Sequence, residues 1–326
     1  MSKIEKALGR ARNEKGLVVV GSRPRTGEPG SQSRDLVAPE SAASVAKSRA
    51  DSAAAIALMK EPSLRDKSEL TLQRIIHPEL AENSTVQAFR EIRTRILQKT
   101  HGQNCIIMVT SVAGDSGSTF VTTNLGMAFA FDAGKTALLV DCNLRNPGLQ
   151  KLFPDKTPLG LTDYLEKADM DVAVIIHPIG IERLRVIPAG DRREIPSEYF
   201  TSIRMKQMLD SIRQRYAERF ILIDAPPMSE TADTQILAEL CDYVLLVVPY
   251  GKVTNGQVDT CIKSIDGKKL LGVIFNNEPS VPSLDWKQVL KTSFVPLWAW
   301  LLQLPLRAWL LQLTRTIRNA TYNSKK

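Results

Sequence analysis

Residues 105–123, with the sequence CIIMVTSVAGDSGSTFVTT, hold small and hydroxyl-bearing side chains in an order that predicts an anion-binding site. The pattern predicts a buried strand over 105–110, a turn over 111–118 and a helix that begins at Thr119. A glycine-containing turn between a strand and a helix N-terminus presents free backbone N–H groups, and the helix dipole adds partial positive charge, so the two together cradle a phosphate. The residues expected to form this cradle are Gly114, Ser116, Gly117, Ser118 and Thr119.

The turn departs from the full phosphate-binding loop, G-x-x-x-x-G-K-[ST], at two positions. Gly117 and Thr119 occupy the second glycine and the hydroxyl positions, whereas Val112 stands in place of the first glycine. Ser118 replaces the lysine that reaches the β- and γ-phosphates. Lys135 lies at the opposite end of the next strand, roughly 17 Å away for five residues, so it cannot replace that lysine within one subunit. The sequence therefore predicts a nucleotide-site shape without its usual cation.

Two aspartates follow apolar runs and are expected to complete the site. Asp141 comes directly after the run 137–140, and Asp224 comes directly after the run 220–223. Because the carboxyl ends of parallel strands lie at one edge of a sheet, we expect both carboxylates beside the phosphate turn. A strand-terminal aspartate can also simply cap the following loop, but the edge that the two share weighs against that alternative.

The elements that must position these residues alternate along the chain. Apolar strands are expected at 105–110, 137–140, 184–187, 220–223, 243–248 and 271–275, with helices between most of them. This alternation predicts an α/β fold with a doubly wound, mostly parallel sheet in a three-layer, P-loop NTPase-like arrangement. The expected organisation is a short N-terminal helix at 1–15, a flexible linker at 16–83, the α/β domain at 84–280 and a distinct C-terminal segment at 281–326.

The composition indicates the cellular compartment of the protein and the chemical class of its partner. The 326 residues carry a formal charge of +8, which favours an acidic partner, and the absence of a basic patch interleaved with aromatic residues favours lipid over nucleic acid. Four scattered cysteines without C-x-x-C spacing predict reduced core residues of a cytoplasmic protein. The N-terminal residues lack the apolar stretch of a secretory signal, and three distant histidines predict no metal held by protein ligands alone.

The C-terminal segment contains all four tryptophans of the chain and is flanked by lysine and arginine. Residues 294–313 carry one charge, but two prolines and two glutamines within them argue against a bilayer span. A Leu/Trp face with cationic flanks is typical of a helix that lies in a membrane interface, with Trp298, Trp300 and Trp309 as contacts. Capping of the α/β core, contact with another protein and a true span remain as alternatives.

The three site segments resemble the Walker A, A′ and B motifs of the bacterial tyrosine kinases (BY-kinases) that control capsule and exopolysaccharide assembly. Asp141 begins the pattern D-x-N-x-R with Asn143 and Arg145, where the family has D-x-D-x-R after an apolar strand. Asp224 begins D-A-P-P, where the family has D-x-x-P. The likeness covers roughly residues 85–277 and rests on the order and spacing of the motifs.

A further stretch of the same likeness lies upstream. The heptapeptide QAFREIR resembles the subunit-contact helix E-x-x-R-x-x-R of the family, with Gln87 in place of glutamate and with Arg90 and Arg93 retained. The resemblance therefore implies a homo-oligomer. Asn276, after the last strand, resembles the family's adenine-edge position, and a simple turn role is equally open.

The resemblance implies ATP or ADP with Mg²⁺ as cofactor, with Thr119, Asp141 and Asp224 holding the metal. If the protein is active, it implies catalytic roles for Asp141, Asp224 and Arg145. Asn143 removes the second A′ carboxylate, which is the usual base for a tyrosine hydroxyl, and the tail offers only Tyr322. Losing a charge-assisted contact such as that of the lysine costs about 1.5–3 kcal/mol, so catalysis should suffer.

We therefore expect a pseudo-kinase that regulates exopolysaccharide polymerisation and export. We expect it to be peripheral on the cytoplasmic face of the inner membrane through its C-terminal segment. The resemblance implies a polysaccharide co-polymerase, the chain-length determinant membrane protein, as its partner. One alternative is an active tyrosine autokinase or ATPase with a rebuilt phosphate loop. The other is a membrane ATPase of the partition and division-site type, which shares this core and in one branch carries a terminal membrane helix.

Overall fold

The structure is a computed structural model, which describes residues 18–20, 56, 59, 61, 63–80, 83–153, 158–216, 218–230 and 232–277. The chain divides into two units, residues 1–278 and 279–326, and every described residue belongs to the first. The N-terminal helix expected at 1–15 and the segment 281–326, with all four tryptophans, lie outside the described residues. Among the residues described, the structure contains no helix long and apolar enough to cross a membrane.

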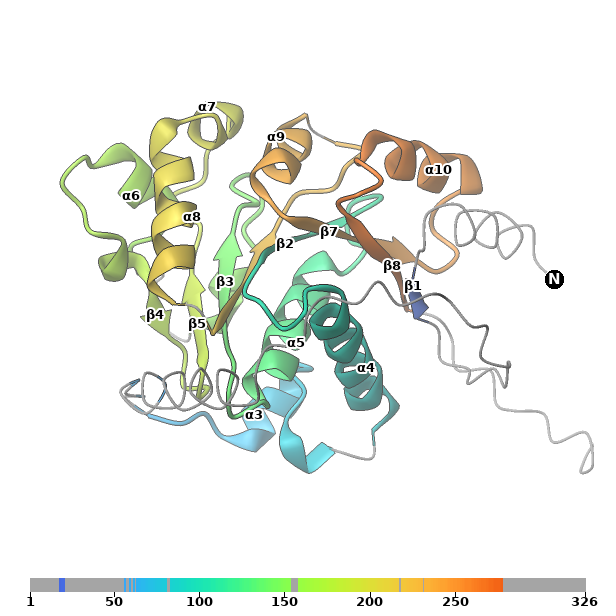
Figure 1. The fold of residues 1–326 in the computed structure, drawn as a ribbon, viewed down its shortest axis with the longest axis horizontal. Helices are drawn as coiled ribbons and strands as arrows, with labels where there is room; N and C mark the ends of the chain where they lie inside the picture. Colours follow the sequence, from blue (N-terminus) through green and yellow to red (C-terminus); the bar gives the residue numbers. More distant parts are fainter. Residues whose placement is uncertain are drawn as a thin grey trace, which may run out of the picture. The chain divides into compact units, whose positions relative to one another are not determined.

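The described part of the chain forms one sheet of eight strands in the order β1-β8-β7-β2-β6-β3-β5-β4 (Figure 1). All neighbouring strands in it are parallel except the pair β4 and β5. The parallel α/β fold predicted from the alternating pattern is confirmed, and all six expected strands are present. Their bounds are β1 (Val18–Val20), β2 (Ile106–Ser111), β3 (Thr136–Asp141), β4 (His177–Pro178), β5 (Leu184–Ile187), β6 (Arg219–Asp224), β7 (Tyr243–Pro249) and β8 (Leu270–Asn276).

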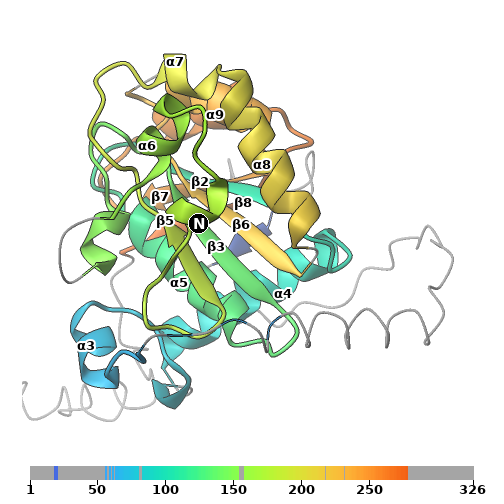
Figure 2. The same ribbon diagram turned by 90° about the vertical axis from the view of Figure 1, so that its left-hand side faces the viewer.

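Helices cover both faces of this sheet, as Figures 1 and 2 show for α4 and α5 on one side and α8 and α9 on the other. Successive strand residues point to opposite faces, so each face receives its own apolar cluster. The helix bounds are α3 (Lys67–Leu72), α4 (Ser84–Lys99), α5 (Ser118–Ala130), α6 (Leu161–Glu166), α7 (Ser197–Phe200), α8 (Ile203–Arg215), α9 (Asp233–Leu240) and α10 (Asn255–Ser264). Short 3-10 helices lie between these elements at η1 (Pro78–Leu80), η2 (Leu149–Leu152) and η3 (Val172–Ile175).

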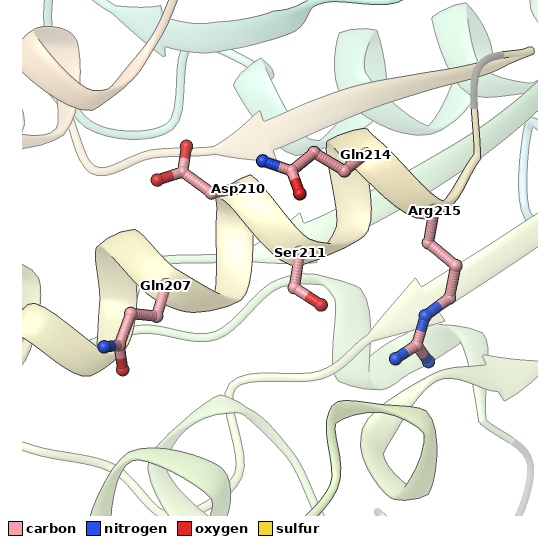
Figure 3. A pocket seen from close by; sticks show the side chains of 5 residues that line it. All are labelled: Gln207, Asp210, Ser211, Gln214 and Arg215. Atoms are coloured by element: carbon pink, nitrogen blue, oxygen red, sulfur yellow. The ribbon is translucent and has the colours of Figure 1, made fainter.

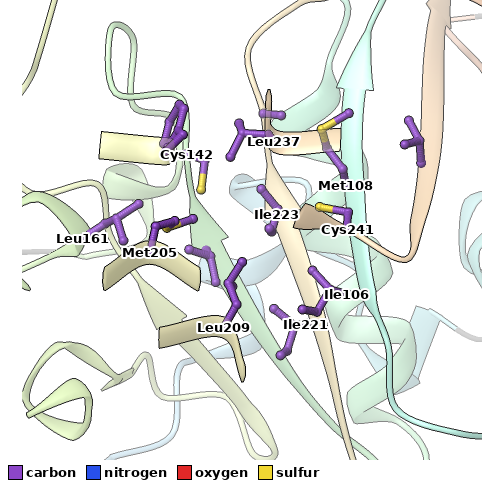
Figure 4. Packing of buried hydrophobic residues seen from close by; sticks show 14 of the residues in the cluster. Ile106, Met108, Cys142, Leu161, Met205, Leu209, Ile221, Ile223, Leu237 and Cys241 are labelled. Carbon is purple, nitrogen blue, oxygen red and sulfur yellow. The ribbon is translucent and has the colours of Figure 1, made fainter. Parts of the chain in front are cut away.

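The apolar face of the amphipathic helix α8 packs against the sheet and forms part of one helical layer. Met205 and Leu209 of α8 are buried on the same cluster as Ile221 and Ile223 of β6 (Figure 4). Cys142 lies in this cluster, and all four cysteines are buried and free, as expected for core residues. Burial raises the pKa of the Cys105 thiol to about 12, so this side chain is an unreactive thiol at neutral pH.

The prediction of a flexible linker through residue 83 is wrong for residues 63–80. These residues form α3 and η1, and Leu70, Ile75 and Ile76 are buried in the core. The stretch is mostly polar, so its composition gave no sign of a core contact. A few apolar side chains are enough here because the backbone polar groups beside them find partners on α5. Within the same expected linker, β1 also pairs with β8.

Candidate functional site

The turn between β2 and α5 forms an open backbone cradle. Its β2 end is anchored, because the Val112 N–H donates to Val247 O at 3.1 Å and Ser111 O accepts the Met228 N–H at 2.8 Å. Asp115 and Gly117 have φ of 52° and 86°, in the left-handed region. Within the described part of the chain, the N–H groups of residues 113–117 donate no hydrogen bond. Free N–H groups in such a turn make a concave anion site, so the backbone fits a phosphate.

Side chains hold this loop in shape. The Ser116 hydroxyl donates to Ala113 O at 2.5 Å, and the Asn276 amide at the end of β8 donates to Ser116 O at 2.8 Å. Asn276 lies so close that a Cβ on Gly117 would be 2.2 Å from its Nδ2 atom. Asn276 was expected near the adenine edge of the site. The structure places it beside the cradle and gives it a contact that the sequence did not predict.

The two aspartates expected at the carboxyl edge lie side by side. Asp141 ends β3, Asp224 ends β6, and the two are direct partners in the register of these parallel strands. Their exposed fractions are 0% and 1%. The Thr119 hydroxyl, in the first turn of α5, donates to Asp224 Oδ2 at 2.6 Å, and Asp141 Oδ2 accepts the Leu149 N–H at 2.9 Å. The cradle helix and both carboxylates therefore meet at one place.

Burial disfavours the ionised form of both carboxyl groups of this pair. Burial raises the pKa of Asp224 to about 7, against the opposing hydrogen bonds from Thr119 and Thr122. Burial also raises the pKa of Asp141 well above its usual range, and the neighbouring charge of Asp224 raises it further. A divalent cation would relieve both effects, because it supplies the positive charge that the pair lacks. Two carboxylates and the Thr119 hydroxyl form an all-oxygen donor set, which fits Mg²⁺.

Arg145 and Lys135, the two cations considered as replacements for the missing lysine, have partners elsewhere. Arg145 Nη2 lies 3.1 Å from Asp233 Oδ2, a buried carboxylate at the start of α9. Lys135 Nζ donates to Gly102 O at 2.7 Å, beyond the amino end of β3, as its position in the sequence predicted. Acidic groups lie nearer to the cradle, since a Cβ on Gly114 would be 2.7 Å from Glu230 Oε1. The loop thus offers dipoles to a phosphate and no lysine at position 118.

The expected subunit-contact residues lie on α4. Arg93 Nη1 donates to Ala128 O of α5 at 2.9 Å, and the Arg90 guanidinium lies 6.0 Å from the centre of the Phe131 ring. Gln87 is exposed on the same helix. Both arginines therefore have partners within their own chain, and their role at a subunit contact stays a prediction.

Two contributors to the site were missed at the sequence level. Thr122 donates to Asp224 Oδ1 at 3.4 Å, and its spacing of three residues from Thr119 places the two hydroxyls on one helix face. That spacing was a usable signal. Asp233 offered none, because its contact with Arg145 joins residues 88 positions apart.

A shallow surface pocket on α8 lies away from this chemistry (Figure 3). Its lining side chains come from a single helix and are exposed or half-buried: Gln207, Asp210, Ser211, Gln214 and Arg215. They form the solvated face of an amphipathic helix, so we assign the pocket no role.

Comparison with known proteins agrees with this geometry. No protein-family model matches the sequence. The chain is 30% identical over 211 residues to tyrosine-protein kinase CpsD of Streptococcus agalactiae serotype III (strain NEM316), which covers 64% of this chain and 89% of the relative. It is 30% identical over 195 residues to tyrosine-protein kinase wzc of Salmonella typhi, covering 59% of this chain and 27% of that protein.

Solved structures give the same result. The kinase domain of Escherichia coli tyrosine kinase ETK superposes with a TM-score of 0.55 at 27% identity, over 66% of this chain and 88% of that one. The chimerical protein CapA2B2 superposes with a TM-score of 0.57 at 27% identity, over 71% of this chain and 99% of that one. Since a tyrosine-protein kinase that is 30% identical to this chain aligns with it over 89% of its own length, the chain belongs to the bacterial tyrosine kinase family.

Proposed function

We propose that this chain is a pseudo-kinase that binds ADP or ATP with Mg²⁺ and regulates the polymerisation and export of a capsular or extracellular polysaccharide. The observation that carries the proposal is the contrast within the site. The free N–H groups of the cradle and the adjacent Asp141 and Asp224 support binding. Ser118 stands where the lysine of an active loop contacts the β- and γ-phosphates.

Phosphoryl transfer should be lost for two separate reasons. Transfer relies on positioning and on neutralising charge at the β- and γ-phosphates, and the nearby Arg145 is already paired with Asp233. The second reason concerns the base. Asn143 occupies the place of the second aspartate, and its amide oxygen accepts the Asn146 N–H at 3.2 Å. A carboxamide is too weak a base to remove the proton from a tyrosine hydroxyl.

The test is incubation of the purified full chain with Mg·ATP. The proposal predicts saturable nucleotide binding without steady ADP release and without phosphotyrosine. ADP release or phosphotyrosine that is abolished by Asp141→Ala or Asp224→Ala would instead support the alternative, an active autokinase or ATPase with a rebuilt loop. That alternative is favoured by the names of the relatives, which are tyrosine-protein kinases.

The same proposal assigns the partner and the location. The partner is the cytoplasmic end of a polysaccharide co-polymerase, and the chain is peripheral on the inner membrane through residues 281–326. Sedimentation with anionic liposomes tests this assignment. Binding that is independent of nucleotide and lost on deleting residues 287–326 supports it, whereas binding that requires nucleotide favours the division-site type of ATPase.

A further inference from the structure

Residues 63–80, here called the strap, cross from the β5 side of the sheet to α5 (light blue in Figures 1 and 2). One end lies on Gly180, which precedes β5. The Arg65 N–H donates to Gly180 O at 2.8 Å, and a Cβ on Gly180 would be 2.9 Å from Ser63 O. Gly180 has φ of 75°, so both its conformation and its lack of a side chain permit this close approach.

The same end of the strap also holds η2. The Arg65 guanidinium donates to Leu152 O, the last carbonyl of η2. Leu152 and Leu149 of η2 are buried in one apolar cluster with Leu70 and Ile76 of the strap. Polar and apolar contacts therefore both fix η2 against the strap.

The other end of the strap is held by Asn124 on α5, whose exposed fraction is 1%. Its Oδ1 accepts the Ile76 N–H at 2.8 Å, and its Nδ2 donates to Arg74 O at 3.1 Å. The same Nδ2 donates to Phe120 O, in the first turn of α5, at 3.0 Å. One buried amide thus joins the strap to the turn of helix that borders the cradle.

The two anchored elements, η2 and α5, hold the two carboxylates. The Leu149 N–H of η2 donates to Asp141, and Thr119 of α5 donates to Asp224. The elements also touch each other, since a Cβ on Gly148 would be 2.5 Å from Thr119 Oγ1. A shift of the strap would therefore be transmitted to both sides of the site.

We propose that the strap positions the two halves of the nucleotide site and that its docking is linked to occupancy of the site. Arg65 and Asn124 are the positioning residues. The inference rests on the proposed function, because it concerns the same site. Linkage is reciprocal, so a ligand that orders η2 and α5 stabilises the docked strap, and release of the strap weakens the ligand.

The test combines hydrogen exchange with calorimetric titration of Mg·ADP on the full chain. Gly180→Ala and Arg65→Lys each disturb the β5 end of the strap without touching the cradle, and Asn124→Ala disturbs the α5 end. Leu72→Ser is the matched control, because Leu72 lies on the strap and is 84% exposed. We expect the three anchor variants to exchange faster at residues 148–152 and to bind Mg·ADP on the order of tenfold more weakly.

The control should match the wild type in both measurements, and Mg·ADP should slow exchange at residues 74–77 of the wild type. Folded variants, shown by an unchanged cooperative melt, that keep wild-type affinity and wild-type exchange at 148–152 would overturn the inference. If the wild type binds no Mg·ADP, the proposed function fails. The strap is then judged by exchange of the unliganded proteins, where equal rates at 148–152 in Gly180→Ala and Leu72→Ser overturn it.

Discussion

Restoring the missing cation is the sharpest perturbation of this site. Ser118→Lys places an ammonium group on the first residue of α5, where an active loop carries its lysine. A charge-assisted contact with phosphate is worth about 1.5–3 kcal/mol. Against it stand the unfavourable helix dipole and competition from the exposed carboxylates of Asp115 and Glu230, together about 0.5–1 kcal/mol. The net gain of about 1–2 kcal/mol corresponds to roughly five- to thirtyfold tighter binding.

Calorimetric titration of Mg·ATP and Mg·ADP measures this gain directly. Ser118→Gln is the matched control, because it supplies length and polarity without charge. The lysine variant should bind both nucleotides more tightly than the glutamine variant, and the difference should shrink as salt is raised. Equal affinities of the two variants would refute the idea that the turn at 111–118 holds phosphates. The lysine alone should not restore phosphotyrosine formation, since Asn143 still replaces the carboxylate base.

Further expectations concern the surroundings of the cradle. Because burial raises the pKa of Asp224 to about 7 and that of Asp141 well above its usual range, this pair binds more protons in the folded protein than in the unfolded chain between about pH 4 and 7. In the absence of metal, the Tm of the wild type relative to that of Asp224→Asn should therefore fall as the pH rises through this window, and a flat or rising difference would contradict the pairing. Arg145→Ala should change Mg·ADP affinity less than about threefold in calorimetry, since its guanidinium is held by a carboxylate, and a larger loss would place it on the ligand. Asn276→Ala should speed hydrogen exchange at residues 116–118, and unchanged exchange would deny it a part in shaping the loop. None of the four cysteines should react with a thiol reagent until the protein unfolds, so rapid labelling of the native chain would contradict their burial.

The sheet and the core of the site were predictable because their signals are local. Each expected strand is a short apolar run, and a parallel sheet brings the ends of such runs to one edge. That rule alone placed Asp141 beside Asp224. The cradle followed from small residues between a strand and a helix, and its bounds differ from expectation by only one residue at β2 and at α5.

The strap and the fate of Arg145 were not predictable, because each depends on partners far along the chain. The Asn124 side chain accepts a hydrogen bond from the Ile76 N–H, 48 positions away in the sequence, and no periodicity in either segment predicts this contact. The sequence predicted that Arg145 could supply positive charge to the site, whereas in the structure its guanidinium is paired with Asp233. Long-range polar contacts of this kind leave no pattern in composition or spacing, although they decide which charges remain available to a ligand.

The central claim is that the site binds a nucleotide but no longer turns it over. A single calorimetric titration of the full chain with Mg·ATP tests both halves of it. The account predicts a saturable isotherm whose baseline returns after each injection, and loss of that isotherm in Asp224→Ala. The absence of binding heat, or a sustained heat of hydrolysis after each injection, would contradict it.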